Sequence, residues 1–316
     1  MSSLKDRIKA AKRGTPQKLK PLVTSWMLEN QNHEWSDAAI DVAVETLKRA
    51  RRMPQYMRNS PSAGHFDNCD RRAVIAFNGH KSDPIDDVVT LGKFADGNYG
   101  HLMWQLRLFD MGFMAAEHVE MFVSVPHWGV AGTCDGVISV PMEGWNPTMG
   151  REEARALVDS GEVPVWWSLL EVKRMASYRF RSCVANDSTE DKITWQGANY
   201  WMGANKKLHP LFSERNRGEA VQDICYWHEN KDTNEFIEFD IVPGDGQIRQ
   251  MHEFYAKVLN SAGGQQLPER PFQDEDKWSP CNRCNMRTHC LRLERKGKTT
   301  LGPASGKKWD KDFPEI

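Results

Sequence analysis

Two acids and a lysine in the middle of the chain are the residues best suited to chemistry. Asp135 follows a Gly-Thr-Cys turn, and Glu171 stands two residues before Lys173 near the end of an apolar segment. A carboxylate on a buried strand is costly unless a cation compensates its charge. Two carboxylates from neighbouring strands supply the oxygen ligands that Mg²⁺ or Mn²⁺ prefers. Lys173 points to the same strand face as Glu171 and can stabilise a hydroxide or a developing phosphate charge.

Three further residues extend this pattern. Gln196 and Tyr200 are four residues apart on an expected helix, so they share one face and can point together at the sheet edge. His101, on an earlier expected helix, can supply a nitrogen ligand. Simpler interpretations stay open: the acid and lysine can form a surface ion pair, His101 can be a hydrogen-bonded core residue, and Tyr200 can simply pack.

Four of the seven cysteines form a second candidate metal site. Cys281, Cys284 and Cys290 have the spacing Cys-x2-Cys-x5-Cys and are expected in one loop, and Cys69 stands alone near the other end of the chain. Four thiolates suit either tetrahedral zinc or an iron–sulfur cluster. Zinc sites more often consist of two Cys-x2-Cys pairs, so the division into one and three favours iron. The remaining cysteines are interpreted as buried thiols.

Composition limits the class of protein and its partners. Of 316 residues, 40% are hydrophobic and 27% charged, as in an ordinary globular protein. The net charge of −1 predicts no polyanion partner, but lysines and arginines crowd both ends, which either attract phosphate backbones or are simply solvated. No apolar run approaches the roughly 20 residues of a membrane span, and no secretory signal is visible. We therefore expect no membrane contact, a cytoplasmic location and reduced cysteines.

The elements that must position these residues follow from the periodicity of the sequence. Alternating apolar residues predict strands near 119–125, 137–140 and 163–173, and a hairpin over 220–228 and 234–242. Helices are expected over about 36–52, 85–115, 151–159, 188–206 and 244–262. This order favours an α/β core with a mixed sheet.

Taken together, these motifs resemble the RecB-type branch of the PD-(D/E)xK nuclease superfamily. The resemblance lies in the order of His101, Gly132-Thr-Cys-Asp135, Glu171-Val-Lys173 and Gln196-Gly-Ala-Asn-Tyr200, and it covers roughly residues 55–295. Cysteines on both sides of this core resemble the iron–sulfur members of the branch: AddB-type helicase–nucleases, the nuclease of CRISPR adaptation and compact phage exonucleases. One departure is Cys134, which stands where a proline usually precedes the first motif acid.

The resemblance implies a role for each matched residue. His101, Asp135, Glu171 and the main-chain carbonyl of Val172 would hold Mg²⁺ or Mn²⁺, and Lys173 would orient and activate the attacking water. Gln196 and Tyr200 would position the scissile phosphate or the lysine. The four cysteines would bind a structural 4Fe–4S cluster. The resemblance also implies three regions: a basic helical region carrying the first cluster cysteine (1–84), the nuclease core (85–262), and a cluster-binding segment with a basic tail (263–316).

The expected activity is DNA phosphodiester hydrolysis by a stand-alone exonuclease. Single strands or DNA ends are the expected substrate, since arginines and aromatics that suit a single strand follow the motif lysine: Arg174, Tyr178, Arg179 and Arg181. A solvated loop is the alternative for this stretch. The resemblance further implies work in recombination or repair, a partner such as a strand-annealing protein, and a host cytoplasm if the gene is phage-encoded. The rival hypothesis is a catalytically silent or zinc-stabilised adaptor that binds DNA ends.

Overall fold

A computed structural model gives the structure of the chain, with residues 17–52, 69–78, 80, 88–125, 130–216, 221–263, 267–270, 281, 284 and 286–296 described. Its helices are α2 (Leu19–Glu29), α3 (Asp37–Arg52), α4 (Asp70–Phe77), α5 (Val88–Asp110), α6 (Arg151–Ser160), α7 (Ser177–Asn186), α8 (Asp191–Asn216), α9 (Asp245–Gly263) and α10 (Arg287–Arg295). Its strands are β1 (Met114–Val119), β2 (Phe122–Val125), β3 (Val130–Thr133), β4 (Gly136–Pro141), β5 (Val165–Met175), β6 (Asp223–Asn230) and β7 (Phe236–Ile241). Most of the basic residues at the two termini lie outside the described residues.

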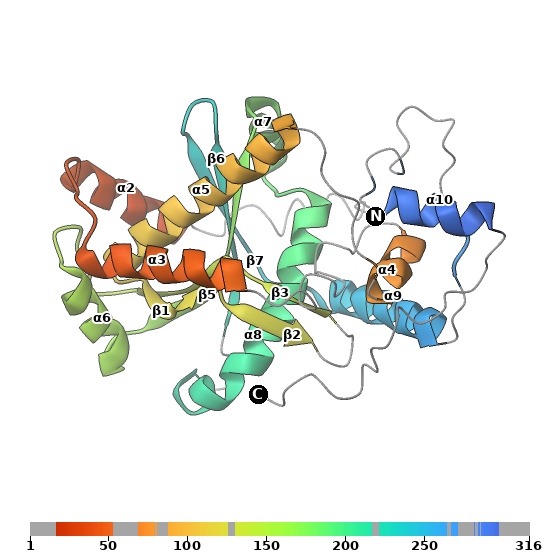
Figure 1. Ribbon diagram of the computed structural model, residues 1–316. Coiled ribbons are helices and arrows are strands. Elements are labelled where there is room, and N and C mark those ends of the chain that lie inside the picture. Colours follow the sequence, from red (N-terminus) through yellow and green to blue (C-terminus); the bar gives the residue numbers. More distant parts are fainter. Residues whose placement is uncertain are drawn as a thin grey trace, which may run out of the picture.

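A mixed five-stranded sheet with helices around it forms the centre of the molecule (Figure 1). The strand order is β1-β4-β5-β6-β7, in which β5 and β6 run parallel and the other neighbours antiparallel. Strands β2 and β3 form a separate two-stranded ribbon that packs against α8. The predicted α/β architecture with a mixed sheet is therefore confirmed.

Alternate residues of β5 enter two different cores. Trp166, Leu170 and Val172 join a cluster that also contains residues of α2, α3 and α5. Trp167 and Leu169 join a second cluster with residues of α6, α7 and α8. Because successive side chains of a strand point to opposite faces, this alternation predicts which face each later residue of β5 will take. Burial on both sides explains the nearly continuous apolar run of this strand.

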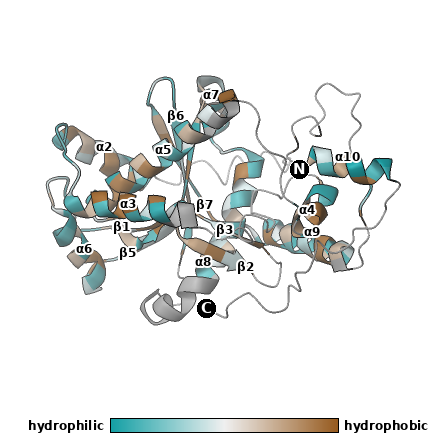
Figure 2. Cartoon of the chain, viewed as in Figure 1, coloured by the Kyte–Doolittle hydropathy of each residue, from teal (hydrophilic) through white to brown (hydrophobic). Residues whose placement is uncertain are grey.

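Helices α3 and α6 have the two-sided character expected of helices that cover a core. Figure 2 shows hydrophobic and hydrophilic residues alternating around both of them. In α3, Ala39 and Val42 are buried in the first core cluster, whereas Ile40 and Val44 remain exposed. Among the described residues no helix is both long and apolar enough to cross a membrane.

Helices α4, α9 and α10 pack together to one side of the sheet (Figure 1). Their shared cluster includes Val74 and Ile75 of α4, Val258 of α9 and Leu293 of α10. Helices α2 and α3, by contrast, pack with the sheet. Residues 1–84, expected to form one region, thus contribute helices to two packing units, and the division at residue 84 stays a prediction.

Four segments differ from the expected elements. The strand expected near 119–125 is interrupted at Glu120, which has a φ of 50°, so that β1 ends at Val119 and β2 begins at Phe122. Helix α5 ends at Asp110, and Gly112 with φ 76° turns the chain into β1, which the expected helix over 85–115 had overlapped. Glycine adopts this left-handed conformation without steric cost. The stretch of cations and aromatics after Lys173 contains α7, whose buried Phe180 and Cys183 have helical spacing. Cys290, expected in one loop with the other late cysteines, lies in α10.

Candidate active site and cysteine pocket

The register of β4 and β5 brings Asp135 next to Glu171. Gly136 pairs with Leu170 in the antiparallel ladder, so the residue before Gly136 lies opposite the residue after Leu170. Both acids are nearly inaccessible, with exposed fractions of 8% for Asp135 and 1% for Glu171. A one-residue change in register would move one acid to the opposite face of the sheet.

Asp135 is held as a carboxylate by its neighbours. Burial favours the neutral acid, but nearby His101 and Lys173 and the Val172 N–H together hold the pKa of Asp135 below its usual value. His101 Nδ1 lies 3.1 Å from Asp135 Oδ1, and the Val172 N–H donates to Asp135 Oδ2 at 2.7 Å. The same contact raises the pKa of His101 against the effect of its burial.

Glu171 has the opposite character. Its Oε1 accepts a hydrogen bond from Lys173 Nζ, while its Oε2 is buried without a hydrogen-bond partner in the described part of the chain. Burial raises the pKa of Glu171 to about 7, with the charge of Lys173 opposing and that of Asp135 adding to the shift. An unsatisfied buried carboxylate oxygen is unfavourable in a protein and is well suited to bind a hard cation.

The structure therefore brings together four of the predicted site residues: His101, Asp135, Glu171 and Lys173. His101 pairs with Asp135, and Lys173 pairs with Glu171. Within the described residues, the ligand atoms of His101, Asp135 and Glu171 do not all lie within 4.8 Å of one another. Their joint role as metal ligands stays a prediction, as does that of the Val172 carbonyl, since the amide of Val172 makes the contact seen here.

Gln196 and Tyr200 lie on α8 and approach each other as their spacing predicts. Gln196 Nε2 is 3.5 Å from the Tyr200 hydroxyl, which is a long and weak hydrogen bond. Tyr200 is 7% exposed and packs over Gly132 of β3, where an added Cβ would lie 2.8 Å from the ring. Burial, with a contribution from Glu171, raises the pKa of Tyr200 above its usual value. The tyrosine thus lies within electrostatic reach of the acids.

The residues predicted to bind nucleic acid differ in exposure. Tyr178 and Arg181 are exposed on α7. Arg179 forms two hydrogen bonds with Glu190, of 2.5 and 2.6 Å. Arg174 pairs with Asp96 and Glu229 on the opposite side of the sheet from Lys173. Of the four predicted residues, only Tyr178 and Arg181 have freely accessible side chains that could contact a polyanion.

Gln105 is a positioning residue to which the sequence pattern gave no role. Its amide nitrogen donates to the Asp135 backbone oxygen at 2.7 Å and to Glu120 at 2.9 Å, and its side chain is fully buried. Glu120 has a left-handed φ of 50°, which is uncommon for a residue with a side chain. The signal in the sequence is the spacing of four between His101 and Gln105, which places both on one face of α5.

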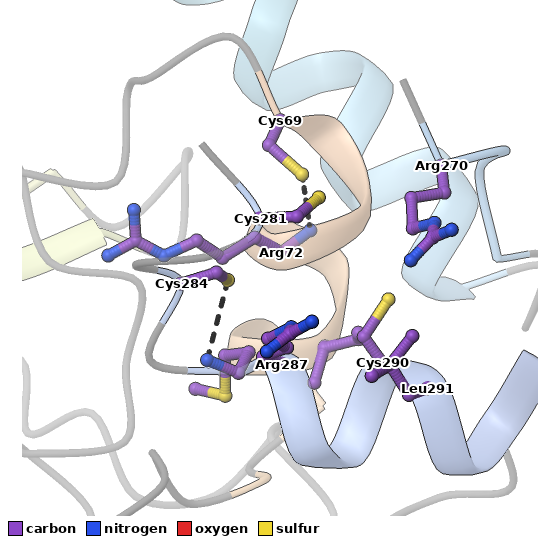
Figure 3. A pocket seen from close by; sticks show the side chains of 10 residues that line it. Cys69, Arg72, Arg270, Cys281, Cys284, Arg287, Cys290 and Leu291 are labelled. Carbon is purple, nitrogen blue, oxygen red and sulfur yellow. Dashed lines mark hydrogen bonds between the residues drawn. The ribbon is translucent and has the colours of Figure 1, made fainter. Parts of the chain in front are cut away.

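All four predicted cluster cysteines line one pocket between α4 and α10 (Figure 3). Cys69 directly precedes α4. Cys281 and Cys284 lie shortly before α10 in the sequence, and Cys290 belongs to α10. Three arginines line the same pocket: Arg72, Arg270 and Arg287. None of the seven cysteines, each of them a described residue, forms a disulfide.

Several donors point at these sulfurs. Arg71 Nε donates to Cys290 Sγ at 3.1 Å, and the backbone N–H groups of Arg72 and Met286 donate to Cys69 and Cys284 at 3.4 Å. Burial raises the pKa of the Cys284 thiol, although the Met286 N–H and Arg72 oppose the shift. Donors and cations around thiolates stabilise them as metal ligands.

A third group, Cys225 with Glu238 and Asp240, has ligand atoms that all lie within 4.8 Å of one another. The oxygens of Glu238 already accept hydrogen bonds from the backbone N–H groups of Lys18, Leu19 and Lys20 at the start of α2. Asp240 carries a proton near neutral pH, because burial and the neighbouring Glu238 raise its pKa to about 9. This group caps the start of α2 through Glu238, and Asp240 Oδ1 is buried without a hydrogen-bond partner among the described residues.

Neither the protein-family models nor the curated proteins compared with this chain gave a match.

Proposed function

We propose that the chain is a metal-dependent deoxyribonuclease of the RecB-type PD-(D/E)xK class that acts on single strands or DNA ends. The observation that supports it best is the pairing of Asp135 with Glu171 across adjacent strands. Lys173 lies beside Glu171, and one oxygen of Glu171 is buried without a hydrogen-bond partner in the described residues. An isolated surface ion pair would bury neither acid.

In this proposal Asp135, Glu171 and His101 hold a divalent metal ion. Such an ion lowers the pKa of bound water and neutralises phosphate charge when bound. The Val172 N–H fixes the orientation of the Asp135 carboxylate. Lys173 keeps its proton, because Glu171 and Asp135 raise its pKa despite burial. It can therefore donate a hydrogen bond to the attacking water or to a phosphate oxygen.

We further propose a 4Fe–4S cluster in the cysteine pocket. With Zn–S bonds of about 2.3 Å, a tetrahedral zinc site places its sulfurs about 3.8 Å apart. The four sulfurs share one pocket. The support for iron over zinc is the division of the four cysteines, with one before α4 and three in the C-terminal part, which matches the iron–sulfur members that the sequence resembles.

The test is an assay of end-labelled single- and double-stranded DNA with Mg²⁺ or Mn²⁺. We expect cleavage that proceeds from an end, requires metal, and falls at least about 100-fold in Glu171→Gln and Lys173→Met. Glu153→Gln, which alters an exposed acid on α6, is the matched control and should cleave normally. Its normal activity would show that losing one negative charge is not enough to abolish cleavage.

The same assay separates this proposal from the adaptor hypothesis. A wild-type protein that binds DNA ends but leaves them intact under every metal condition would favour an adaptor. Cleavage that survives both Glu171→Gln and Lys173→Met would instead show that the active site lies elsewhere. The order in which labelled products appear tests whether cleavage proceeds from an end. A role in recombination or repair is inferred from the family resemblance alone.

A further inference from the structure

Arg174 lies on the opposite side of the sheet from the catalytic lysine. It directly follows Lys173 in β5, so its side chain leaves the strand on the face covered by α5. The side chain is only 14% exposed. Its NH1 group donates to Asp96 Oδ1 of α5 at 2.8 Å, and its Nε lies 3.2 Å from Glu229 Oε2 of β6.

Glu229 connects the arginine to a second residue of α5. It lies beside Arg174 in the parallel register of β5 and β6 and is 8% exposed. The same oxygen that faces Arg174 accepts a 2.6 Å hydrogen bond from Trp104 Nε1. A buried carboxylate needs such partners, and here they come from a strand and a helix at once.

Gly100 provides the space through which Arg174 reaches these partners. A Cβ at position 100 would lie 1.8 Å from Arg174 Cδ, closer than any real contact. Asp96, Gly100 and Trp104 are spaced by four and form one stripe of α5. His101 directly follows Gly100, and its Nδ1 contacts Asp135 Oδ1.

We propose that Arg174 is a positioning residue that fixes α5 against the sheet so that His101 reaches Asp135, and that it is not a phosphate contact. Two carboxylates already compensate its charge, and little of its surface is accessible. The inference rests on the proposed function, because it takes His101 as a ligand of the catalytic metal. It replaces the nucleic-acid role expected for Arg174 from the sequence.

Two glycines of α5 allow a matched test. Gly100→Ala adds a methyl group where Arg174 lies, whereas Gly97→Ala adds the same group where nothing lies within 4 Å. Both changes raise helix propensity equally, so that effect cancels between them. We expect Gly100→Ala and Arg174→Ala to weaken Mn²⁺ binding about tenfold, measured by calorimetry on the full chain, and Gly97→Ala to leave it unchanged.

DNA binding in the absence of metal gives the second measurement. We expect the affinity of Arg174→Ala for a single-stranded oligonucleotide, and its dependence on salt, to match the wild type. A lost phosphate contact would weaken binding and reduce the salt slope by about one unit. That result, together with unchanged Mn²⁺ binding, would overturn the inference.

A double-mutant cycle tests whether the effect passes through His101. In a His101→Ala background, Gly100→Ala should produce no further loss of Mn²⁺ affinity. An undiminished loss would overturn the inference.

Equal Mn²⁺ binding by the wild type and Gly100→Ala would also overturn the inference while leaving the proposed function intact. A wild type that binds no Mn²⁺ would overturn both. If Arg174→Ala fails to fold, shown by circular dichroism, the comparison of the two glycine variants still decides.

Discussion

At the scale of single residues, Glu171 is an acid in surroundings that oppose its charge. Its pKa of about 7 results mainly from burial, which Lys173 only partly offsets. A metal ligand must be ionised, so metal binding below that pH has to release a proton. We expect Mn²⁺ affinity to rise at least about tenfold from pH 6 to pH 8, because the ionised fraction of Glu171 rises by that factor. Loss of the proton from His101, whose pKa is raised by Asp135, adds to this rise. Calorimetry in buffers of different ionisation enthalpy measures both the affinity and the proton release.

The control for this prediction is Glu171→Gln, which removes the titrating group and keeps its size. The variant should bind Mn²⁺ weakly and keep only the pH dependence that the proton of His101 contributes. An affinity that stays constant across this range in the wild type would show that Glu171 is not a ligand or is already ionised at pH 6.

Individual residues also show where sequence reasoning succeeds. The common face of Glu171 and Lys173 was predictable, because alternation along a strand fixes which side chains share a face whatever the distant context. The contact of Asp135 with them depends on the register of β4 and β5, which is set by tertiary packing. The partners of Arg174 were not, because Asp96 and Glu229 reach it only through tertiary packing. An arginine near aromatics has the same local sequence whether it is exposed or paired.

At the scale of elements, Glu238 of β7 fixes the start of α2 to the sheet. Its two oxygens accept four hydrogen bonds from the backbone N–H groups of Lys18, Leu19 and Lys20. Helix N-termini favour a carboxylate, because several N–H groups there have no partner within the helix. We expect Glu238→Gln to lower the free energy of unfolding by about 2 kcal/mol, since an amide replaces one acceptor with a donor. Denaturant unfolding measures it.

The neighbouring hairpin turn offers the control. Glu235→Gln changes an exposed acid close to the same strand and should alter stability by less than about 0.5 kcal/mol. Hydrogen exchange at the first turn of α2 should also accelerate in Glu238→Gln alone. Equal stabilities of the two variants would contradict the cap.

Asp240, beside Glu238, predicts a pH effect of definite sign. Its pKa is about 9 in the folded protein, raised first by burial and then by Glu238. The folded state therefore holds this proton to higher pH than the unfolded chain, and stability falls as pH rises from about 4 to about 9. Asp240→Asn mimics the protonated acid. We expect it to raise stability by about 2 kcal/mol at pH 7 and to flatten the fall, seen in melting temperatures across this range.

Agreement between the two proteins at about pH 2.5 is the internal control, since the acid is then protonated in both states. A variant less stable than the wild type at pH 8 would show that Asp240 is ionised in the folded protein. It would also reopen the Cys225, Glu238 and Asp240 group as a cation site.

The elements themselves were predictable to different degrees. Strand β5 and helices α3, α6, α8 and α9 have long periodic patterns, and the structure confirms them. Helix α7 was missed, because its ten residues include only two buried side chains, too few for a clear helical stripe. The start of β1 was missed because Gly112 was not recognised as the end of α5.

At the scale of the whole molecule, the cysteine pocket joins parts of the chain that are more than two hundred residues apart. Helix α4 has eight residues, and an isolated helix of that length is unstable in water. It depends on α9 and α10, with which it shares a small hydrophobic cluster. A metal cluster between Cys69 and the later cysteines would cross-link the chain and add several kcal/mol by restricting the unfolded state.

Removing one cluster cysteine should therefore affect both metal content and stability. We expect Cys281→Ala to lose iron and visible absorbance and to lower the free energy of unfolding by about 3 kcal/mol or more, because a cross-link over a long loop is lost. Cys183→Ala is the matched control: it alters a buried cysteine on α7, outside the pocket, and should keep its iron at a cost of about 1 kcal/mol. Iron analysis, absorbance spectra and denaturant unfolding of anaerobic protein give the measurements.

A colourless wild type with one equivalent of zinc would contradict the iron cluster, and full iron content in Cys281→Ala would exclude this cysteine as a ligand. Amide exchange should then separate the two packing units, because loss of the cluster exposes α4 and α10 first while the central sheet, whose two cores do not include them, stays protected.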